Sequence, residues 1–182
     1  MRGKALVIGS LMVLAPLVVW GARTRALRVP LEVVPEVDLA RYMGTWYEIA
    51  RFPNRFEEGC VAAKATYTLR ENGTVDVLNE CRIDRLDGTL KTARGAARVV
   101  DRATNAKLKV TFFWPFYGKY WIIDLGDDYD YAVVGHPARK YLWILSRKPA
   151  MNDVLYGRLL ETLSTKGYDV SRLVKTSQPE DL

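Results

Sequence analysis

GTWY (Gly44–Tyr47) opens the first strand-like run of this chain, and LWILSR (Leu142–Arg147) closes the last one. A tryptophan at the start of a sheet and an arginine at its end can meet only if the sheet closes on itself. We therefore expect the Arg147 guanidinium to stack on the Trp46 indole and to cap one end of a barrel. Such a contact is worth about 1–2 kcal/mol when it is shielded from water.

Between these two motifs, strand-like runs recur at short spacing and are separated by turn residues. This pattern is typical of an all-β barrel or sandwich. On the run near 90–99, Ala93, Gly95 and Ala97 share one face, and such small inward residues would leave volume inside a barrel. The eight predicted strands are about 45–53, 61–70, 74–82, 90–99, 106–113, 119–125, 130–135 and 141–147.

One helix is predicted after the last strand, over about Asp153–Lys166. Asn152 is a suitable N-cap, and Gly167 stands at the C-terminal stop. Its leucines recur at helical spacing and form one apolar stripe. We expect this stripe to pack on the outside of the barrel; its members are Leu155, Leu159, Leu160 and Leu163.

The chain resembles the lipocalin family from about Val37 to Val174. Three motifs carry the resemblance: Gly44-x-Trp46, Asp128-Tyr129-x-Tyr131, and Arg147 after the last strand. The resemblance implies an all-β fold, an eight-stranded antiparallel up-and-down barrel with one C-terminal α-helix packed outside. It assigns residues 36–176 to this barrel and helix.

Within the family, the chain is similar to the bacterial lipocalins, which are related to apolipoprotein D. Phe112–Gly118 and Tyr141–Pro149 fit that subgroup. The resemblance implies binding, storage or transport of a lipophilic ligand, such as a fatty acid or lysophospholipid, in the bacterial cell envelope.

Up-and-down strands alternate between the two ends of a barrel, so the chain can be followed from end to end. If Trp46 lies at the floor, the Asp128-Tyr129 turn and Arg147 fall at the same end. We therefore expect these positions to be structural, with no direct ligand role. The predicted floor consists of Gly44, Trp46, Tyr131 and Arg147.

The same counting places four loops at the mouth: 53–59, 83–88, 114–118 and 136–140. Their exposed aromatics could form a lipid-contacting lip or fold over one another as a plug. Trp121 is the best single candidate for a pocket wall, with ordinary core as the alternative. The predicted ligand-binding residues are Phe52, Phe56, Tyr67, Phe112, Trp114, Phe116, Tyr117, Trp121 and Ile123.

Cations near the mouth could pair with an anionic lipid head group, or could simply be solvated loop charges. The candidates are Arg51, Arg55, Arg139 and Lys140.

The first 30 residues read as a targeting segment. Arg2 and Lys4 precede an uncharged apolar run, Ala5–Trp20, which is typical of a signal peptide. An uncleaved N-terminal membrane anchor is the alternative, because basic residues follow the run directly. No cysteine precedes Cys60, so no N-terminal lipoprotein cysteine is available. We expect an exported protein in the periplasm or an envelope membrane.

Two cysteines flank one predicted hairpin. Cys60 and Cys81 lie at its open end, and in an exported protein two cysteines usually form one disulfide. Two reduced, buried thiols are the alternative. The alternation of the two strands gives the cysteines opposite parity, so a bulge or an irregular strand entry must correct the register.

The net charge of +6 does not indicate nucleic-acid binding. Residues 1–30 contribute five bases and no acid, which leaves the remainder near neutrality. No catalytic constellation is present, since His136 is the only histidine and no nucleophile motif accompanies it. We expect no enzyme, no metal and no cofactor. The alternatives are a barrel-based, isomerase-like enzyme, and a structural or surface-acting envelope protein without a ligand.

Overall fold

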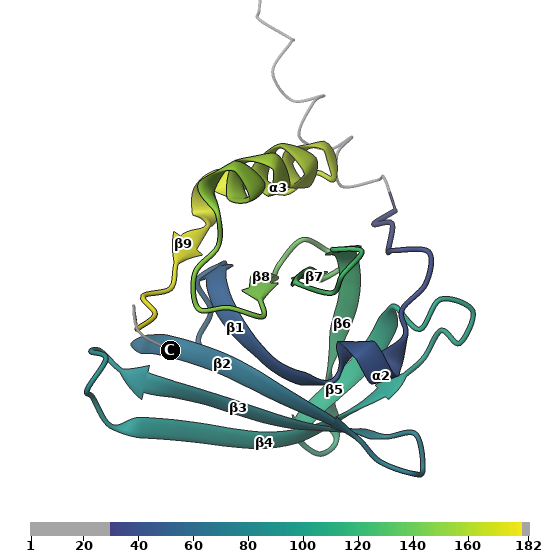
Figure 1. The fold of residues 1–182 in the computed structure, drawn as a ribbon. Helices are drawn as coiled ribbons and strands as arrows, with labels where there is room; N and C mark the ends of the chain where they lie inside the picture. Colours follow the sequence, from purple (N-terminus) through teal and green to yellow (C-terminus); the bar gives the residue numbers. More distant parts are fainter. Residues whose placement is uncertain (1–29, 180–182) are drawn as a thin grey trace, which may run out of the picture.

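A computed structural model describes residues 30–179, and within this range eight antiparallel strands close into a barrel (Figure 1). Strand order runs from β2 through β8 to β1, and β1 pairs again with β2. The predicted fold class is therefore confirmed. The strands are β1 (Gly44–Arg51), β2 (Cys60–Leu69), β3 (Val75–Ile83), β4 (Leu90–Val99), β5 (Lys107–Phe113), β6 (Phe116–Leu125), β7 (Tyr131–Gly135) and β8 (Leu142–Ser146).

The barrel closes in two steps along β1. The floor half of β1 pairs with β2, with Trp46 opposite Ala65. Beyond it the two strands diverge, and the short strand β9 (Val174–Lys175) pairs with the other half of β1. Backbone bonds on either side fasten this C-terminal segment, from Thr176 N to Ile49 O at 2.9 Å and from Ala62 N to Ser177 O at 2.7 Å.

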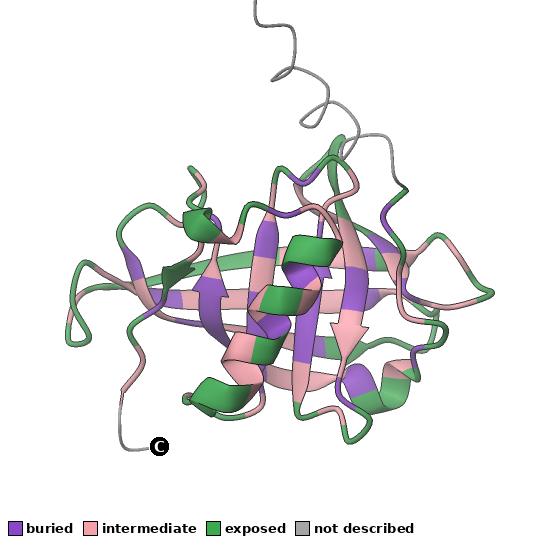
Figure 2. Cartoon of the chain, turned by 90° about the horizontal axis from the view of Figure 1, so that it is seen from above, coloured by how far each residue is buried: buried purple, intermediate pink, exposed green. Residues whose placement is uncertain are grey.

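Helix α3 (Asp153–Thr165) lies outside the barrel, across the strands, with its exposed side outward (Figure 2). Asn152 caps it, since its Oδ1 accepts from Val154 N at 2.8 Å. Leu159 and Leu163 are buried against the barrel, whereas Leu155 is only partly buried. A 3-10 turn (Val170–Arg172) follows, and a one-turn helix, α2 (Leu39–Tyr42), precedes β1.

The two larger hydrophobic clusters of the described residues follow from this architecture. The inner cluster fills the floor half of the barrel and includes Trp46, Tyr67, Val77 and Ile122. The outer cluster lies between the barrel wall and α3. Its buried members include Phe52, Ile123, Val133, Ile144, Leu159, Leu163 and Tyr168.

The outer cluster corrects three predicted pocket residues. Phe52, Trp121 and Ile123 pack in it and do not face the barrel interior. On β6 the inward residue is Ile122, so Trp121 points outward by alternation. The pairing of β6 with β7 then shifts between Ile122 and Asp124, which leaves Ile123 on the outer side as well. Trp121 is therefore not a wall of the interior.

The two cysteines form a disulfide, as predicted. Their Cα atoms lie 5.5 Å apart across β2 and β3. The expected register correction is also present, because the pairing of these strands shifts between Val61 and Lys64, where Ala62 adopts a φ of +48°. The bulge turns Cys60 towards Cys81.

The targeting segment predicted for residues 1–30 lies outside the described residues, apart from Pro30. Among the residues that are described, no helix has both the length and the apolar character that crossing a bilayer requires.

Candidate ligand-binding site

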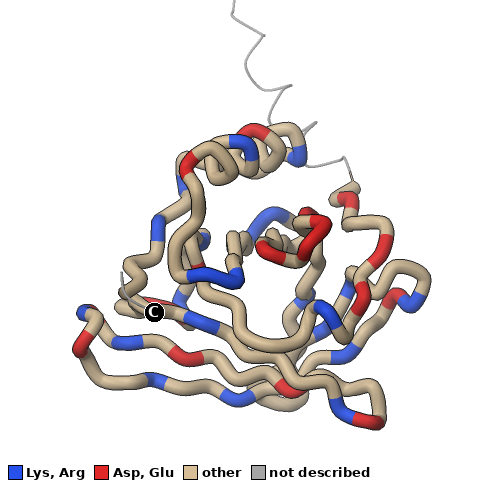
Figure 3. The backbone as a smooth tube through the Cα atoms, in the orientation of Figure 1, with Lys and Arg blue, Asp and Glu red and all other residues tan. Residues whose placement is uncertain are grey.

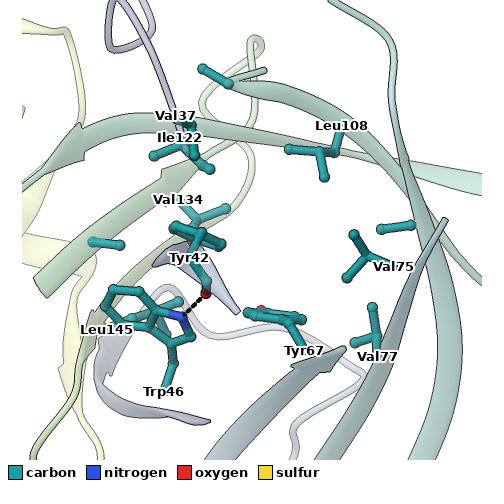
Figure 4. Packing of buried hydrophobic residues seen from close by; sticks show 13 residues of the cluster. Val37, Tyr42, Trp46, Tyr67, Val75, Val77, Leu108, Ile122, Val134 and Leu145 are labelled. Carbon is teal, nitrogen blue, oxygen red and sulfur yellow. Dashed lines mark hydrogen bonds between the residues drawn. The ribbon is translucent and has the colours of Figure 1, made fainter. Parts of the chain in front are cut away.

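The floor of the barrel is closed by Arg147 and Trp46. The guanidinium carbon of Arg147 lies 3.8 Å from the indole centroid, and Trp46 is fully buried. Trp46 Nε1 donates to Tyr42 O at 2.9 Å (Figure 4). Gly44 has a φ of +93°, and a Cβ there would lie 3.3 Å from Arg147 Nη1. The contact expected from the two sequence motifs is thus present.

Arg147 also ties three segments together at this end. It donates to the carbonyl oxygens of Thr45 at 2.9 Å, Arg41 at 2.8 Å and Tyr129 at 3.2 Å. Because the Arg147 guanidinium donates to three carbonyl oxygens and also stacks on an indole, its position is fixed. The floor is therefore a fixed base for whatever lies above it.

Tyr129 takes the place at the floor that the sequence assigned to Tyr131. Tyr131 packs in the outer cluster, and its hydroxyl donates to Asp124 Oδ1 at 3.2 Å. Tyr129 instead accepts from Asp38 N through its hydroxyl at 2.8 Å, and Arg41 lies 4.1 Å above its ring. Tyr129 lies in the turn before β7 and adopts a φ of +58°. This turn directs Tyr129, and not Tyr131, to the floor.

Three tyrosine hydroxyls form a chain above the floor. The hydroxyls of Tyr42 and Tyr120 are 2.8 Å apart, and Tyr120 donates to Tyr67 at 3.1 Å. Burial raises the pKa of Tyr67 to about 12 and keeps all three phenols neutral. The bottom of the interior is therefore aromatic, with neutral polar groups at its centre (Figure 4).

The half of β4 nearer the mouth is exposed to solvent. Leu90–Arg94 are all exposed, although alternate residues of a strand point inward. Ala93 lies opposite Asn79, on the same face as the inner-cluster residue Val77 opposite Gly95. An inward residue that is exposed has no protein packed against it. Water therefore reaches the inner face of β4 in this half of the barrel.

Small or apolar side chains line this open part. Asn79 is the exception, because its Oδ1 is buried yet makes no hydrogen bond within the described part of the chain. An orphaned buried acceptor is costly and invites a donor from a bound molecule. The inward wall consists of Asn79, Ala93, Gly95, Phe112 and Gly118.

A charged cluster occupies the β1 side of the mouth. Arg51 Nη1 donates to Glu48 Oε1 at 2.6 Å, and Trp143 Nε1 donates to Glu57 Oε2 at 3.0 Å. Thr176, from the segment after β9, also donates to Glu48. Burial first, and then the Glu57 carboxylate, raise the pKa of Glu48 to about 8. Two carboxyl groups here share one arginine, so one of them holds a proton.

A lipocalin-like domain matches residues 37–178, which is most of the chain and all of the barrel. The chain is a lipocalin. It is 45% identical over 148 residues to the outer membrane lipoprotein Blc of Escherichia coli, covering 81% of this chain and 82% of that protein. Mouse apolipoprotein D is 35% identical, covering 78% and 77% of the two chains.

The temperature-induced lipocalin-1 of Arabidopsis thaliana is 42% identical to this lipocalin, covering 82% of this chain and 84% of the plant protein. Among solved structures, insecticyanin from the tobacco hornworm Manduca sexta superimposes with a TM-score of 0.68 at 22% identity, covering 82% of this chain and 85% of that chain. That likeness concerns the fold alone.

The structure separates the predicted ligand-binding residues of this lipocalin into three groups. Tyr67 and Phe112 face the interior. Phe52, Trp121 and Ile123 lie in the outer cluster. The remaining four lie exposed at the mouth; they are Phe56, Trp114, Phe116 and Tyr117. Sequence reasoning missed Asn79, which no motif marks.

Two of the cations that were expected to pair with a lipid head group make hydrogen bonds within the protein. Arg51 is held by Glu48, and its Nη2 donates to the carbonyl oxygen of Glu57 at 2.9 Å. Arg139 is buried, and its guanidinium donates to Lys166 O at 3.2 Å, which ties its loop to the end of α3. Arg55 and Lys140 are exposed. Across residues 30–179, no three His, Cys, Asp or Glu side chains gather into a group that could hold a metal ion.

We expect Glu48 to make the protein less stable as pH rises. Its pKa is 4.5 ordinarily and about 8 in the folded protein, so between these values only the folded state keeps the proton. The contribution of Glu48 to the unfolding free energy should be highest below pH 4.5 and fall by on the order of 1 kcal/mol per pH unit towards pH 8. Glu48→Gln should flatten this slope, as measured by urea denaturation across the pH range.

Glu80→Gln is the control, because Glu80 lies on β3 in a partly exposed pair with Lys64 at 3.4 Å. This variant should keep the slope of the parent protein. Equal slopes for Glu48→Gln and the parent would show that Glu48 does not hold the proton.

Proposed function

We propose that this lipocalin binds a fatty acid or lysophospholipid in the open half of its barrel, and stores or carries it in the bacterial cell envelope. The observation that carries this proposal is the exposed inner face of β4 above a closed floor. A cup with one open end and an aromatic bottom suits a ligand with one long apolar part.

Burial of the acyl chain supplies most of the binding free energy, at about 0.8 kcal/mol for each methylene group. Phe112, Ala93 and Gly95 provide the apolar wall. The amide group of Asn79 accepts a hydrogen bond from a ligand hydroxyl, since its Oδ1 has no protein donor. Lys91 is exposed at the mouth end of β4, where its Nζ donates to Phe56 O at 3.0 Å, and an ammonium group has further protons with which to pair with a carboxylate or phosphate.

The role is binding and not catalysis. His136 lies in a turn, where its Nδ1 accepts from Ala138 N at 3.1 Å, and burial with nearby lysines lowers its pKa. Both cysteines are oxidised, so neither is a nucleophile. These observations disfavour the isomerase-like alternative. A surface-acting protein without a ligand remains the competing function, and it predicts an interior that stays empty.

The location we propose is the cell envelope, reached by export. Similar proteins from Escherichia coli and Vibrio cholerae are named outer membrane lipoproteins. Cys60 and Cys81 are joined in a disulfide, so neither of them carries a lipid in this proposal. Residues 1–30 act as the signal peptide or as the membrane anchor in this proposal.

Ala93→Trp should weaken binding of a dansyl-labelled fatty acid by about tenfold or more, equivalent to about 1.4 kcal/mol. The indole would enter the open interior opposite Asn79 and take the place of the ligand. Fluorescence titration measures the dissociation constant, and unlabelled lysophospholipid competes for the same site.

Ala96→Trp is the control, because Ala96 points outward between Asp76 and Thr111. It should leave affinity within twofold of the parent value, on the order of 0.4 kcal/mol. If the two variants bind equally well, the ligand does not occupy this part of the barrel.

Native mass spectrometry of the protein purified from its own envelope identifies the ligand class. A lipid that remains bound in the native spectrum and is released on denaturation supports the carrier function. A protein that is empty in its native envelope favours the surface-acting alternative.

A further inference from the structure

The hairpin between β5 and β6 exposes three large aromatic side chains at the mouth. Phe113 is 78% exposed, Trp114 82% and Phe116 77%, and Phe113 pairs directly with Phe116. No polar side chain interrupts Phe112–Tyr117. Single exposed apolar residues are common, but a contiguous aromatic tip marks an interaction surface.

A row of cations crosses the outer face of the strands that carry this tip. Arg98 lies opposite Lys109, and Lys109 lies opposite Lys119, on β4, β5 and β6. Like charges directly opposite one another destabilise a sheet. The row therefore lowers the stability of the sheet, and the fold alone gives no reason for it. Arg94 lies on the same face, four residues nearer the mouth. Figure 3 shows Lys and Arg positions in blue along β4, at the lower edge of the barrel.

These four cations have no acidic partner within the described residues. Arg98 stacks over Tyr117 at 5.5 Å, and the other three carry exposed ammonium or guanidinium groups. Between residues 90 and 123 the single acid is Asp101, which pairs with Lys107 at 3.0 Å. The near-neutral total for the barrel therefore conceals a basic outer face on β4, β5 and β6, bordered on β3 by Asp76 and Glu80, which pair with Arg70 and Lys64.

We propose that the aromatic tip (Phe113–Phe116) and the cation row (Arg94, Arg98, Lys109 and Lys119) dock this lipocalin on the anionic surface of a lipid bilayer. Lys119 is three residues from Phe116 and Lys109 is four from Phe113, about 10 and 13 Å along the strands. If the aromatic side chains lie at the acyl boundary, about 5–10 Å deep in the bilayer, the cations lie at the level of the lipid phosphate groups.

Hydrocarbon fits the tip better than nucleic acid does, because the tip has no polar side chain to read a base edge. The surface is separate from the ligand wall: Lys109 and Lys119 point outward, whereas Val110 and Gly118 point inward. The docking proposal therefore does not depend on the identity of the ligand. It places the open half of the barrel beside the bilayer.

The test is co-sedimentation of the full chain with vesicles of phosphatidylcholine, alone or with 30% phosphatidylglycerol. Residues 1–29 are the same in every variant, so their contribution cancels. Trp114→Ser with Phe116→Ser should weaken binding at least tenfold on both vesicles. Lys109→Gln with Lys119→Gln should weaken it by on the order of twentyfold on anionic vesicles alone, and salt should abolish that difference.

Lys148→Gln with Lys175→Gln is the control, because it removes two exposed charges from another face and should change binding less than twofold. Lipids brominated on their chains should quench the parent protein more than Trp114→Phe, which places Trp114 itself in the bilayer. Equal quenching, or equal binding of the parent and all variants, would overturn the proposal. So would a tip variant that changes only the oligomeric state, since the tip would then join two copies of the chain.

Discussion

Trp46→Ala should lower the unfolding free energy by about 3–5 kcal/mol, the loss expected for a fully buried large aromatic side chain. Trp46 has no exposed surface, packs on Tyr42 with 5.0 Å between ring centroids, and supports Arg147. Removal of the indole leaves a cavity and takes away the surface on which the guanidinium stacks. Urea denaturation followed by far-ultraviolet circular dichroism measures the loss.

Trp114→Ala is the matched control, because Trp114 is 82% exposed. It should change stability by no more than about 0.5 kcal/mol. If the two tryptophan variants unfold at the same urea concentration, Trp46 does not act as the floor of the barrel.

Replacement of both cysteines by alanine should cost about 3 kcal/mol. The disulfide links residues 21 positions apart and restricts the unfolded chain, by roughly that amount for a loop of this length. It also fastens β2 to β3 where the bulge at Ala62 interrupts their pairing. The midpoint of thermal unfolding should fall accordingly.

A reductant provides the internal control for this second prediction. It should bring the parent protein down to the stability of the Cys60→Ala, Cys81→Ala variant and leave that variant unchanged. A variant as stable as the oxidised parent would mean that the hairpin needs no covalent link.

The barrel could be predicted because its signals are local. Alternation along each run and Asn152 before the helix depend on neighbouring residues alone. The order of eight such runs then fixes which ends meet. For this reason the contact between Trp46 and Arg147 was predicted although the residues lie far apart in the chain.

The residues that line the interior were predicted less well. Successive residues of a strand point to opposite faces, so the prediction depends on which face is chosen. The assignment of Trp121 and Ile123 to the interior assumed unbroken alternation along β6, with the wrong face chosen. The structure places Ile122 inside and shifts the register directly after it. A one-residue error reverses every side chain of a strand, and no local pattern marks the bulge. Phe52 was also assigned to the wrong side of the barrel wall. It packs outside the barrel on Tyr168, which follows the helix.

The sequence by itself predicted the β-rich fold and the outer helix through periodicity and turn residues, and the closed barrel and its capped floor through the lipocalin motifs. It also predicted the disulfide, from two cysteines in a chain with an export signal. Only the tertiary structure decided which side chains face the interior, and that Glu48 is buried beside Arg51, Glu57 and the segment after β9, where its pKa is raised. It also revealed the cation row, because Arg98, Lys109 and Lys119 are neighbours only across strands. Cross-strand register is a long-range property, and it sets both the open wall of the barrel and the charge of its outer face.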